Sequence, residues 1–295
     1  MSTDPVAEAH DGSVADLVRR SLGGLSVSER KVARALLAAY PVAGLETVAR
    51  LAARAGVSGP TVVRFVARLG FDGYADFQRA LRADLAAQAA SPLALYERAD
   101  RRREGDRGGD DLVSRAGESA RAATAATFAS LSADEVERAV EVLATSRRVL
   151  LSGGRYSVLL ARYLHQHLEQ LRPRATMVPE PVSSRAAALS ELSRKDVVVL
   201  FDFRRYEPQA RSLAQEARRR HARVLLFTDS YLSPVAATAD VVLAADVSSV
   251  SPFDTMATSM FLVETCIAGV VERLGDEARD RMTQIETAAG RLGLY

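Results

Sequence analysis

Cysteine, histidine and tryptophan are scarce in this chain, and their scarcity excludes several kinds of site. The 295 residues include one cysteine, Cys266, four histidines and no tryptophan. A single cysteine excludes an intrachain disulfide and a cysteine-based zinc cluster. His165 and His167 lie two positions apart on an expected helix, so they face different sides and cannot both bind one metal. We therefore predict no metal site.

Long apolar runs and a basic leader are also lacking. No apolar run approaches the roughly 20 residues that a membrane span requires. The first residues, MSTDPVAEAHDG, do not have the basic and apolar pattern of a secretory signal. The net charge is only +2, so binding to a nucleic acid would need a local basic patch. We expect a cytoplasmic protein without membrane contact.

The composition supports folded domains, because 48% of the residues are apolar and 26% are charged. Residues 14–90 carry helix signals without a convincing strand. The segment 91–111 ends in a charged, glycine-rich stretch, which is typical of an exposed linker. Residues 112–295 return to helical periodicity and then alternate strands with helices. We predict two domains with these boundaries.

The second domain contains short β-rich runs separated by segments of helix length. Such alternation is typical of a parallel sheet covered on both faces. We predict a doubly wound α/β domain with a five-stranded parallel sheet, and we expect the apolar helix at 256–271 to form a dimer seam. The β-rich runs are 147–154, 175–178, 196–203, 223–229 and 240–246.

The first domain is predicted to be all-α and to contain a helix-turn-helix. Ser28 is expected to cap a helix that runs to Tyr40. In LETVARLAARAGVSGPTVVRFVARLGF (45–71), Gly56 supplies a positive-φ turn and Ser58 caps the following helix. The second helix of such a unit enters the major groove of DNA with its N-terminal residues leading.

Outward-facing positions of that second helix are candidates for DNA contacts. Thr61 and Arg64 are expected to reach base edges, because arginine can bind guanine O6 and N7 together. Residues 26–88 hold nine Lys/Arg against five Asp/Glu, an excess that suits a polyanion. A helical packing element with a solvated arginine face, or a protein-binding surface, would have the same pattern. The candidates for phosphate contacts are Ser58, Arg68 and Arg54.

The chain resembles the RpiR (MurR/RpiR) family of bacterial transcriptional regulators in the stretches LSVSERKVARALL, LAARAGVS, TVVRFVARLGFDGYADFQRAL and SPLALYERA. The resemblance spans residues 14–275. It implies a helix-turn-helix joined to a C-terminal sugar isomerase (SIS) domain that senses a phosphosugar. We therefore expect a ligand-responsive regulator, not an enzyme, that binds a double-stranded DNA operator as a homo-oligomer, either a dimer or a tetramer.

Ligands of open α/β sheets bind beyond the carboxyl ends of the strands, and the first such end here is LLSGGRYS, 150–157. The loop resembles the first ligand loop of a SIS domain, because two glycines permit close backbone approach and the following helix directs N–H groups at the site. Two glycines after a strand are also typical of a tight turn. The loop lacks the third glycine of a dinucleotide fingerprint, so we predict no cofactor. The candidate ligand contacts are Ser152, Gly153, Gly154, Arg155 and Ser157.

A second strand end reads FDFRRYEP, 201–208, where SIS domains usually carry a Ser-x-Ser-Gly-x-Thr/Ser loop that cradles phosphate. Arg204 and Arg205 would replace that loop with a guanidinium fork for carboxylate or phosphate. In one alternative, Arg204 pairs with Asp202 or Glu207 and an aromatic side chain of the loop fills the pocket. In another, the loop is a subunit interface. The expected effector is an acidic or phosphorylated metabolite.

Other strand ends and helix starts supply supporting candidates. Asp202 is assigned to the pocket, and Thr228 would close its floor, although an ordinary strand cap has the same sequence. Ser251 lies where the last helix begins and is either a ligand contact or an N-cap. A sugar-phosphate isomerase is an alternative function, but it needs an acid/base pair, and Glu264 has no matched acid nearby. A constitutive regulator with a vestigial pocket is a further alternative.

Overall fold

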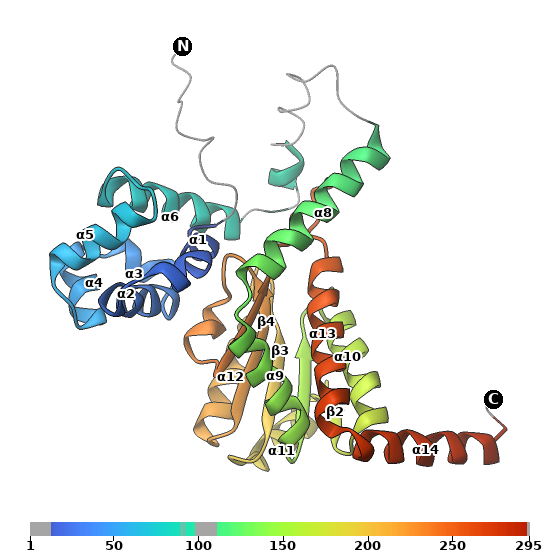
Figure 1. Ribbon diagram of the computed structural model, residues 1–295. Helices are drawn as coiled ribbons and strands as arrows, with labels where there is room; N and C mark the ends of the chain where they lie inside the picture. The colour runs from blue at the N-terminus through green and yellow to red at the C-terminus, as the bar shows by residue number, and fades with distance from the viewer. Residues whose placement is uncertain (1–12, 90, 92, 98–110, 294–295) are drawn as a thin grey trace.

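The computed structural model describes residues 13–89, 91, 93–97 and 111–293. A helical N-terminal domain lies beside a C-terminal domain built around a sheet (Figure 1). Within the described ranges, no helix is both long and apolar enough to cross a membrane. Most of the predicted linker at 91–111 falls outside them, so its boundaries stay a prediction.

The N-terminal domain packs short helices around one core, in which Leu36 and Phe65 are fully buried. The first long helix begins differently from the prediction. Ser26, not Ser28, is its N-cap, and Ser26 exchanges hydrogen bonds with Glu29 in a capping box. The elements are α1 (Val14–Ser21), the 3-10 helix η1 (Leu22–Gly24), α2 (Val27–Leu37), α3 (Val42–Leu45), α4 (Val48–Ala55), α5 (Gly59–Arg68) and α6 (Tyr74–Gln88).

The C-terminal domain confirms the predicted doubly wound fold. Its five strands form one parallel sheet in the order β2-β1-β3-β4-β5. The strands are β1 (Val149–Gly153), β2 (Ala175–Met177), β3 (Val197–Phe201), β4 (Arg223–Asp229) and β5 (Val241–Ala245). The helices are α8 (Leu112–Ser130), α9 (Ala133–Thr145), α10 (Val158–Leu171), α11 (Val182–Ser190), α12 (Pro208–Arg219), the 3-10 helix η2 (Pro234–Ala237), α13 (Ala257–Leu274) and α14 (Asp276–Arg291).

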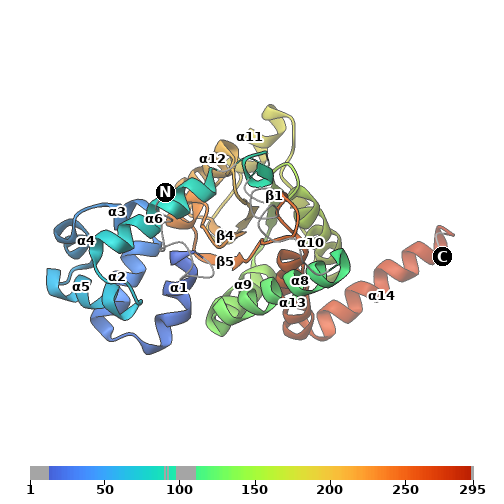
Figure 2. The same ribbon diagram turned by 90° about the horizontal axis from the view of Figure 1, so that it is seen from above.

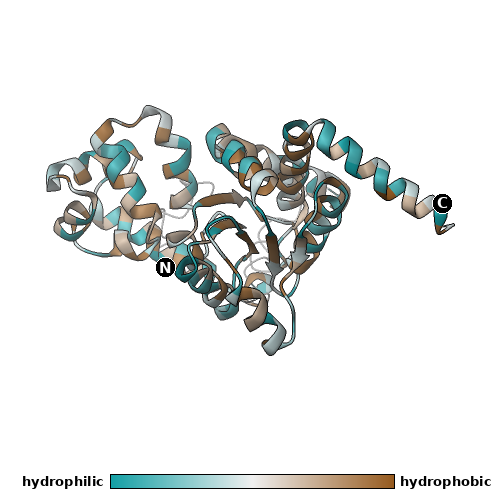
Figure 3. Cartoon of the chain, turned by 90° about the horizontal axis from the view of Figure 1, so that it is seen from below, coloured by the Kyte–Doolittle hydropathy of each residue, from teal (hydrophilic) through white to brown (hydrophobic). Residues whose placement is uncertain are grey.

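Helices cover both faces of the sheet (Figure 2), and alternate residues of the strands pack against opposite layers. Val149 and Leu151 pack with α9, α10 and α13, whereas Leu150 packs with α11 and α12. The central strand β3 is buried along its whole length, as is typical of a sheet covered on both faces. The strands at the centre of Figure 3 are accordingly hydrophobic. This packing fixes where the strand ends and their loops lie.

The two domains meet at the loop between β4 and η2, residues 230–233, which we call the β4–η2 loop. The Ser13 hydroxyl donates a hydrogen bond to the Ser230 carbonyl at 2.7 Å. The Gln88 side-chain amide donates to the Tyr231 carbonyl at 2.6 Å. Because Ser13 precedes α1 and Gln88 ends α6, both ends of the helical domain hold this loop. Apolar side chains of the loop and of β5 extend the helical core.

The helices α9 and α13 approach each other closely at Gly269. A Cβ atom on Gly269 would lie 2.5 Å from Cγ2 of the buried Val140. We predict that Gly269→Ala lowers the free energy of unfolding by about 1–3 kcal/mol, because the added methyl group overpacks this contact. Chemical denaturation measures the change. Gly117→Ala on α8 is the matched control, since no atom lies within 4 Å of that Cβ position.

The control is expected to raise the free energy of unfolding by up to about 1 kcal/mol, because alanine favours a helix interior over glycine. If Gly269→Ala is as stabilising as the control, the close approach of α9 and α13 is wrong.

Asp84 on α6 fixes the start of α1 and gives the domain a pH dependence. Its carboxylate accepts the Val14 N–H at 2.8 Å and the Tyr40 hydroxyl. Burial raises the pKa of Asp84 to about 6, although both hydrogen bonds act in the opposite direction. The folded state therefore binds more protons than the unfolded state between about pH 4 and pH 6, and this group destabilises the fold as the pH rises through that window.

We predict that Asp84→Asn removes this dependence. The free energy of unfolding of the unmodified protein, relative to the variant, should fall by up to about 3 kcal/mol between pH 4 and pH 6. Denaturant titrations at several pH values test this, with the exposed Asp72→Asn as a control. Parallel pH profiles for the unmodified protein and Asp84→Asn would contradict the prediction.

Candidate functional site

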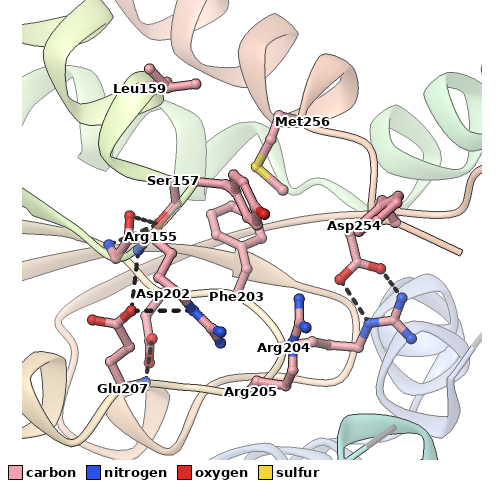
Figure 4. Close-up of a pocket in the computed structure, with 13 residues that line it drawn as sticks. Arg155, Ser157, Leu159, Asp202, Phe203, Arg204, Arg205, Glu207, Asp254 and Met256 are labelled. Carbon is pink, nitrogen blue, oxygen red and sulfur yellow. Dashed lines mark hydrogen bonds and ion pairs between the residues drawn. The ribbon is translucent and has the colours of Figure 1, made fainter. Parts of the chain in front are cut away.

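A cavity of 410 Å³ opens at the point where the strand order reverses. In a sheet of this order, ligands bind beyond the carboxyl ends of β1 and β3, which are the strands that flank the reversal. Figure 4 shows the cavity and its side chains. Of the predicted contacts, the lining includes Gly154, Arg155, Ser157, Asp202, Arg204 and Arg205; the other lining residues are Tyr156, Leu159, Phe203, Glu207, Phe253, Asp254 and Met256.

Arg204 is held on three sides and joins three loops. Its guanidinium forms a two-point ion pair with Asp254, with Nε 3.2 Å from Oδ2. Its Cζ atom lies 5.5 Å from the centre of the Tyr231 ring, a distance at which a cation is attracted to an aromatic face. Its backbone N–H donates to Asp229 Oδ2 at 2.6 Å. Arg204 thus links the cavity to the β4–η2 loop.

Arg205 is the lining cation that the protein leaves unbalanced. Within the described part of the chain, its guanidinium forms neither a hydrogen bond nor an ion pair, and Figure 4 draws no contact from it. Its backbone has a φ of 66°, a left-handed conformation that costs a non-glycine residue about 1 kcal/mol. Burial is the main cause that lowers the pKa of the Arg205 guanidinium, and repulsion by the cations of Arg155 and Arg204 lowers it further. Backbone strain of this kind clusters at functional sites.

Glu207 occupies the corner of the cavity beside the first loop. Its Oε1 accepts the Arg155 N–H at 3.1 Å and lies 3.9 Å from Arg155 Nε. A Cβ atom on Gly154 would lie 2.6 Å from the same oxygen, so the missing side chain leaves room for this carboxylate. Glu207 therefore pairs with Arg155, and its expected alternative pairing with Arg204 is wrong.

Asp202 lies at the base of the cavity and braces its own loop. Oδ1 accepts the Glu207 N–H at 3.0 Å, and Oδ2 accepts the Ser233 hydroxyl. Burial raises the pKa of Asp202 to about 6, while the hydrogen bonds from Ser233 and Glu207 act to lower it. Asp202 does not pair with Arg204 either, so this alternative is also corrected.

Ser157 closes the first loop instead of presenting a free hydroxyl. Its Oγ donates to the Phe201 carbonyl at 2.7 Å and accepts the Gly154 N–H at 2.9 Å. The neighbouring residues Ser152 and Gly153 line a separate cavity of 270 Å³. A Cβ atom on Gly153 would lie 2.7 Å from the backbone of Ser157, so this glycine permits close packing against the start of α10.

Two further predicted contacts lie away from the cavity. Thr228 is fully buried, and its hydroxyl accepts the Ser233 N–H at 3.1 Å. Ser251 is exposed, and its hydroxyl donates to the Phe253 carbonyl at 3.2 Å within a turn. Thr228 is therefore an ordinary strand cap, and Ser251 stabilises its own loop.

The helices α4 and α5 form the predicted helix-turn-helix. Gly56 ends α4 with a φ of 63°, the left-handed conformation expected of it. Ser58 is the N-cap residue of α5, and Pro60 lies in its first turn. The Ser58 hydroxyl is 3.0 Å from the Thr61 hydroxyl and does not cap a backbone amide.

The outer face of α5 differs from the prediction at one position. Thr61 faces the core and is only 6% exposed, whereas the expectation placed it outside. Val63, which the sequence did not identify, takes the outward position and is 49% exposed. Arg64 is exposed, and its guanidinium lies 3.3 Å from the Thr61 hydroxyl. Arg54 and Arg68 are partly exposed but form ion pairs with nearby glutamates at 2.9 Å and 3.4 Å.

Glu264, His165 and His167 are not part of the cavity lining. Glu264 accepts a hydrogen bond from the Tyr163 hydroxyl at 3.2 Å and is not part of the lining. The ring nitrogens of His165 and His167 contact backbone carbonyls of different elements. Among the residues that the structure describes, no cluster of three or more His, Cys, Asp or Glu side chains is suited to a metal ion.

Two parts of this chain match models of known protein domains. The model of the rpiR-family helix-turn-helix domain matches residues 12–88, and the model of the SIS domain matches residues 142–268. The chain is 26% identical to the HTH-type transcriptional regulator HexR of Escherichia coli (strain K12) over 275 residues, 92% of each protein. It is 28% identical to the uncharacterized HTH-type transcriptional regulator YfhH of the same organism over 215 residues, which are 72% of this chain and 73% of that protein.

The fold is also that of a solved protein. The Vibrio vulnificus NanR protein complexed with ManNAc-6P aligns with a TM-score of 0.53 and 22% identity, over 94% of this chain and 98% of NanR. The two domain matches show that the chain joins an rpiR-family helix-turn-helix domain at residues 12–88 to a SIS domain at residues 142–268.

Proposed function

We propose that this protein is a transcriptional regulator in which α5 binds operator DNA and a small anionic metabolite in the cavity changes the operator affinity. The relatives HexR and YfhH are named as HTH-type transcriptional regulators, and NanR is described in complex with ManNAc-6P. These names support double-stranded DNA and a small-molecule effector as the partners of this chain.

The outer face of α5 supplies the DNA contacts in this proposal. Arg64 has no carboxylate partner within the described residues, so it is available for a bidentate contact with guanine. Val63 offers methyl groups to the methyl group of a thymine. Arg54 on α4 and Arg68 at the end of α5 exchange their glutamates for backbone phosphates, and Ser58 adds a hydroxyl contact to a phosphate.

A continuous series of contacts from the cavity to the helix-turn-helix domain carries the regulatory part of the proposal. Arg204 lines the cavity, and its backbone N–H and guanidinium contact Asp229 and Tyr231. The N–H of Tyr231 also donates to Asp229, at 2.9 Å. The Tyr231 carbonyl accepts the side chain of Gln88 at the end of α6. A ligand in the cavity that moves the loop of Arg204 and Arg205 therefore also disturbs the β4–η2 loop, on which the DNA-binding domain rests.

Two copies of the chain would present two recognition helices to adjacent half-sites. We propose that α13 forms the seam between copies in a dimer or a tetramer. Phe261 and Val271 on α13 are large apolar side chains that remain 44% and 38% exposed, which supports burial in such a contact.

We predict that Arg64→Ala weakens binding to the preferred operator by about 1–3 kcal/mol, which corresponds to loss of a bidentate base contact. The operator is first selected from a random duplex pool with the unmodified protein, and affinities are then measured by fluorescence anisotropy at fixed salt. Arg82→Ala, which removes an exposed arginine of α6, is the control. It should lower specific and non-specific affinity alike.

The DNA-binding assignment of α5 fails if Arg64→Ala discriminates the selected operator from random DNA as well as the unmodified protein does.

We predict that Arg204→Ala and Asp254→Asn both weaken operator binding in the absence of any effector, by fivefold or more. Each change breaks the same ion pair and loosens the β4–η2 loop, so the DNA-binding domain loses preorganisation. The variants are first checked for folding by circular dichroism. Arg211→Ala, an exposed arginine on α12 that is not part of the cavity lining, is the control. Wild-type operator affinity in both folded variants would rule out coupling through this loop.

A further inference from the structure

The cavity lining holds three arginines and three carboxylates, and one of these cations has no carboxylate within ion-pair distance among the described residues. Of the lining arginines, Arg204 pairs with Asp254, and Arg155 lies beside Glu207. Asp202 is buried and its oxygens accept hydrogen bonds from its own loop and from Ser233. Only Arg205 lacks a carboxylate among the described residues of the cavity. A monoanion can pair with this one cation, whereas a phosphate monoester brings about −1.5 to −2 at pH 7 to a lining whose formal charges already cancel.

Three groups of the first loop that could hold a phosphate already have protein partners. The Gly154 N–H donates to Ser157 Oγ, and the Ser157 hydroxyl donates to the Phe201 carbonyl. The Arg155 N–H donates to the Glu207 carboxylate. That carboxylate lies where a bound anion would otherwise meet the start of α10. A phosphate in this corner would therefore be repelled by a resident negative charge, and the N–H groups of Gly154 and Arg155 are already engaged.

The rest of the lining is apolar and offers little to a polyhydroxylated ligand. Phe203 and Met256 form the inner wall, and Leu159 and Phe253 at the rim are 61% and 55% exposed. The hydroxyl groups of the lining belong to Ser157 and to an exposed tyrosine, and that of Ser157 is engaged. Sugar hydroxyls placed against this wall would lose their hydrogen bonds to water without replacement. An apolar group in the same place is stabilised by its burial.

We propose that the cavity is selective for an organic monocarboxylate with an apolar body, such as an aryl or medium-chain acid, and that it disfavours sugar phosphates. The carboxylate pairs with Arg205, which presents two parallel N–H donors to it. The apolar body lies against Phe203, Met256 and the rim. The assignment rests on the proposed function only in treating this cavity as the effector site. It deepens that function by naming the ligand class.

The test is isothermal titration calorimetry of the full chain with defined probes and without DNA. The probes are 3-phenylpropionate, its neutral analogue 3-phenylpropanamide, glucose 6-phosphate and inorganic phosphate. We expect saturable binding of 3-phenylpropionate, with the amide and glucose 6-phosphate each at least tenfold weaker. Arg205→Ala should weaken 3-phenylpropionate at least tenfold, and Arg211→Ala should leave it unchanged.

A second variant tests the reason for selectivity without removing the carboxylate partner. Glu207→Gln keeps the shape of the side chain and removes the resident negative charge. It should strengthen glucose 6-phosphate binding at least tenfold and change 3-phenylpropionate binding less than threefold. If Glu207→Gln leaves glucose 6-phosphate binding unchanged, the resident carboxylate does not exclude phosphate.

Three results overturn the assignment: no binding of 3-phenylpropionate, tighter binding of glucose 6-phosphate than of the carboxylate, or equal carboxylate affinity in Arg205→Ala. None of them affects the DNA-binding proposal, which depends on the Arg64→Ala comparison. Conversely, if α5 does not bind DNA but 3-phenylpropionate binds through Arg205, the ligand class stands and the regulatory function falls.

Discussion

The ion pair between Arg204 and Asp254 is the contact on which the geometry of the site depends. Both side chains are largely buried, 11% and 12% exposed, so breaking the pair would leave an uncompensated charge in a poorly solvated place. The pair joins the loop after β3 to the loop before α13, and Arg204 also contacts Asp229 and Tyr231. The Arg204 side chain therefore fixes both the rim of the cavity and the β4–η2 loop, which contacts the DNA-binding domain.

The sheet fixes the position of the loop after β3 independently of the residues that form the loop. Because the two faces of β3 are covered by helices, its carboxyl end emerges at the reversal of strand order whatever residues follow it. Here those residues put Arg205 in a left-handed conformation that glycine adopts more easily. Glu207 starts α12 and turns its carboxylate toward Gly154 and Arg155. The loop thus stands where the resemblance to SIS domains predicts a hydroxyl-rich ligand loop, and it carries two arginines and a glutamate there.

Local signals in the sequence predicted the strands and the helix-turn-helix. Buried runs such as 197–201 and the glycine turn at Gly56 are set by neighbours in the chain, so periodicity and turn chemistry suffice. The cap at Ser26 was also available, because Glu29 stands three residues later in the capping-box spacing. The prediction that Ser28 is the cap neglects this spacing and is wrong.

Local sequence signals do not determine the direction in which an individual side chain points, because that direction depends on packing against distant segments. Thr61 turned inward because the register of α5 against the core places it there. Thr228 and Ser251 both stand at ends of elements, but their hydroxyls serve nearby backbone groups. The partner of Arg204 lies 50 residues away in sequence and is brought to it only by the closure of the sheet and α13.

The coupling between cavity and operator is tested most directly by titrating 3-phenylpropionate into the free protein and into the protein saturated with its selected operator. Coupled sites must influence each other by the same factor in either order of binding. The structure predicts that the carboxylate affinity differs between the two titrations by fivefold or more. Identical affinities would contradict the claim that Arg204 and the β4–η2 loop connect the cavity to the DNA-binding domain.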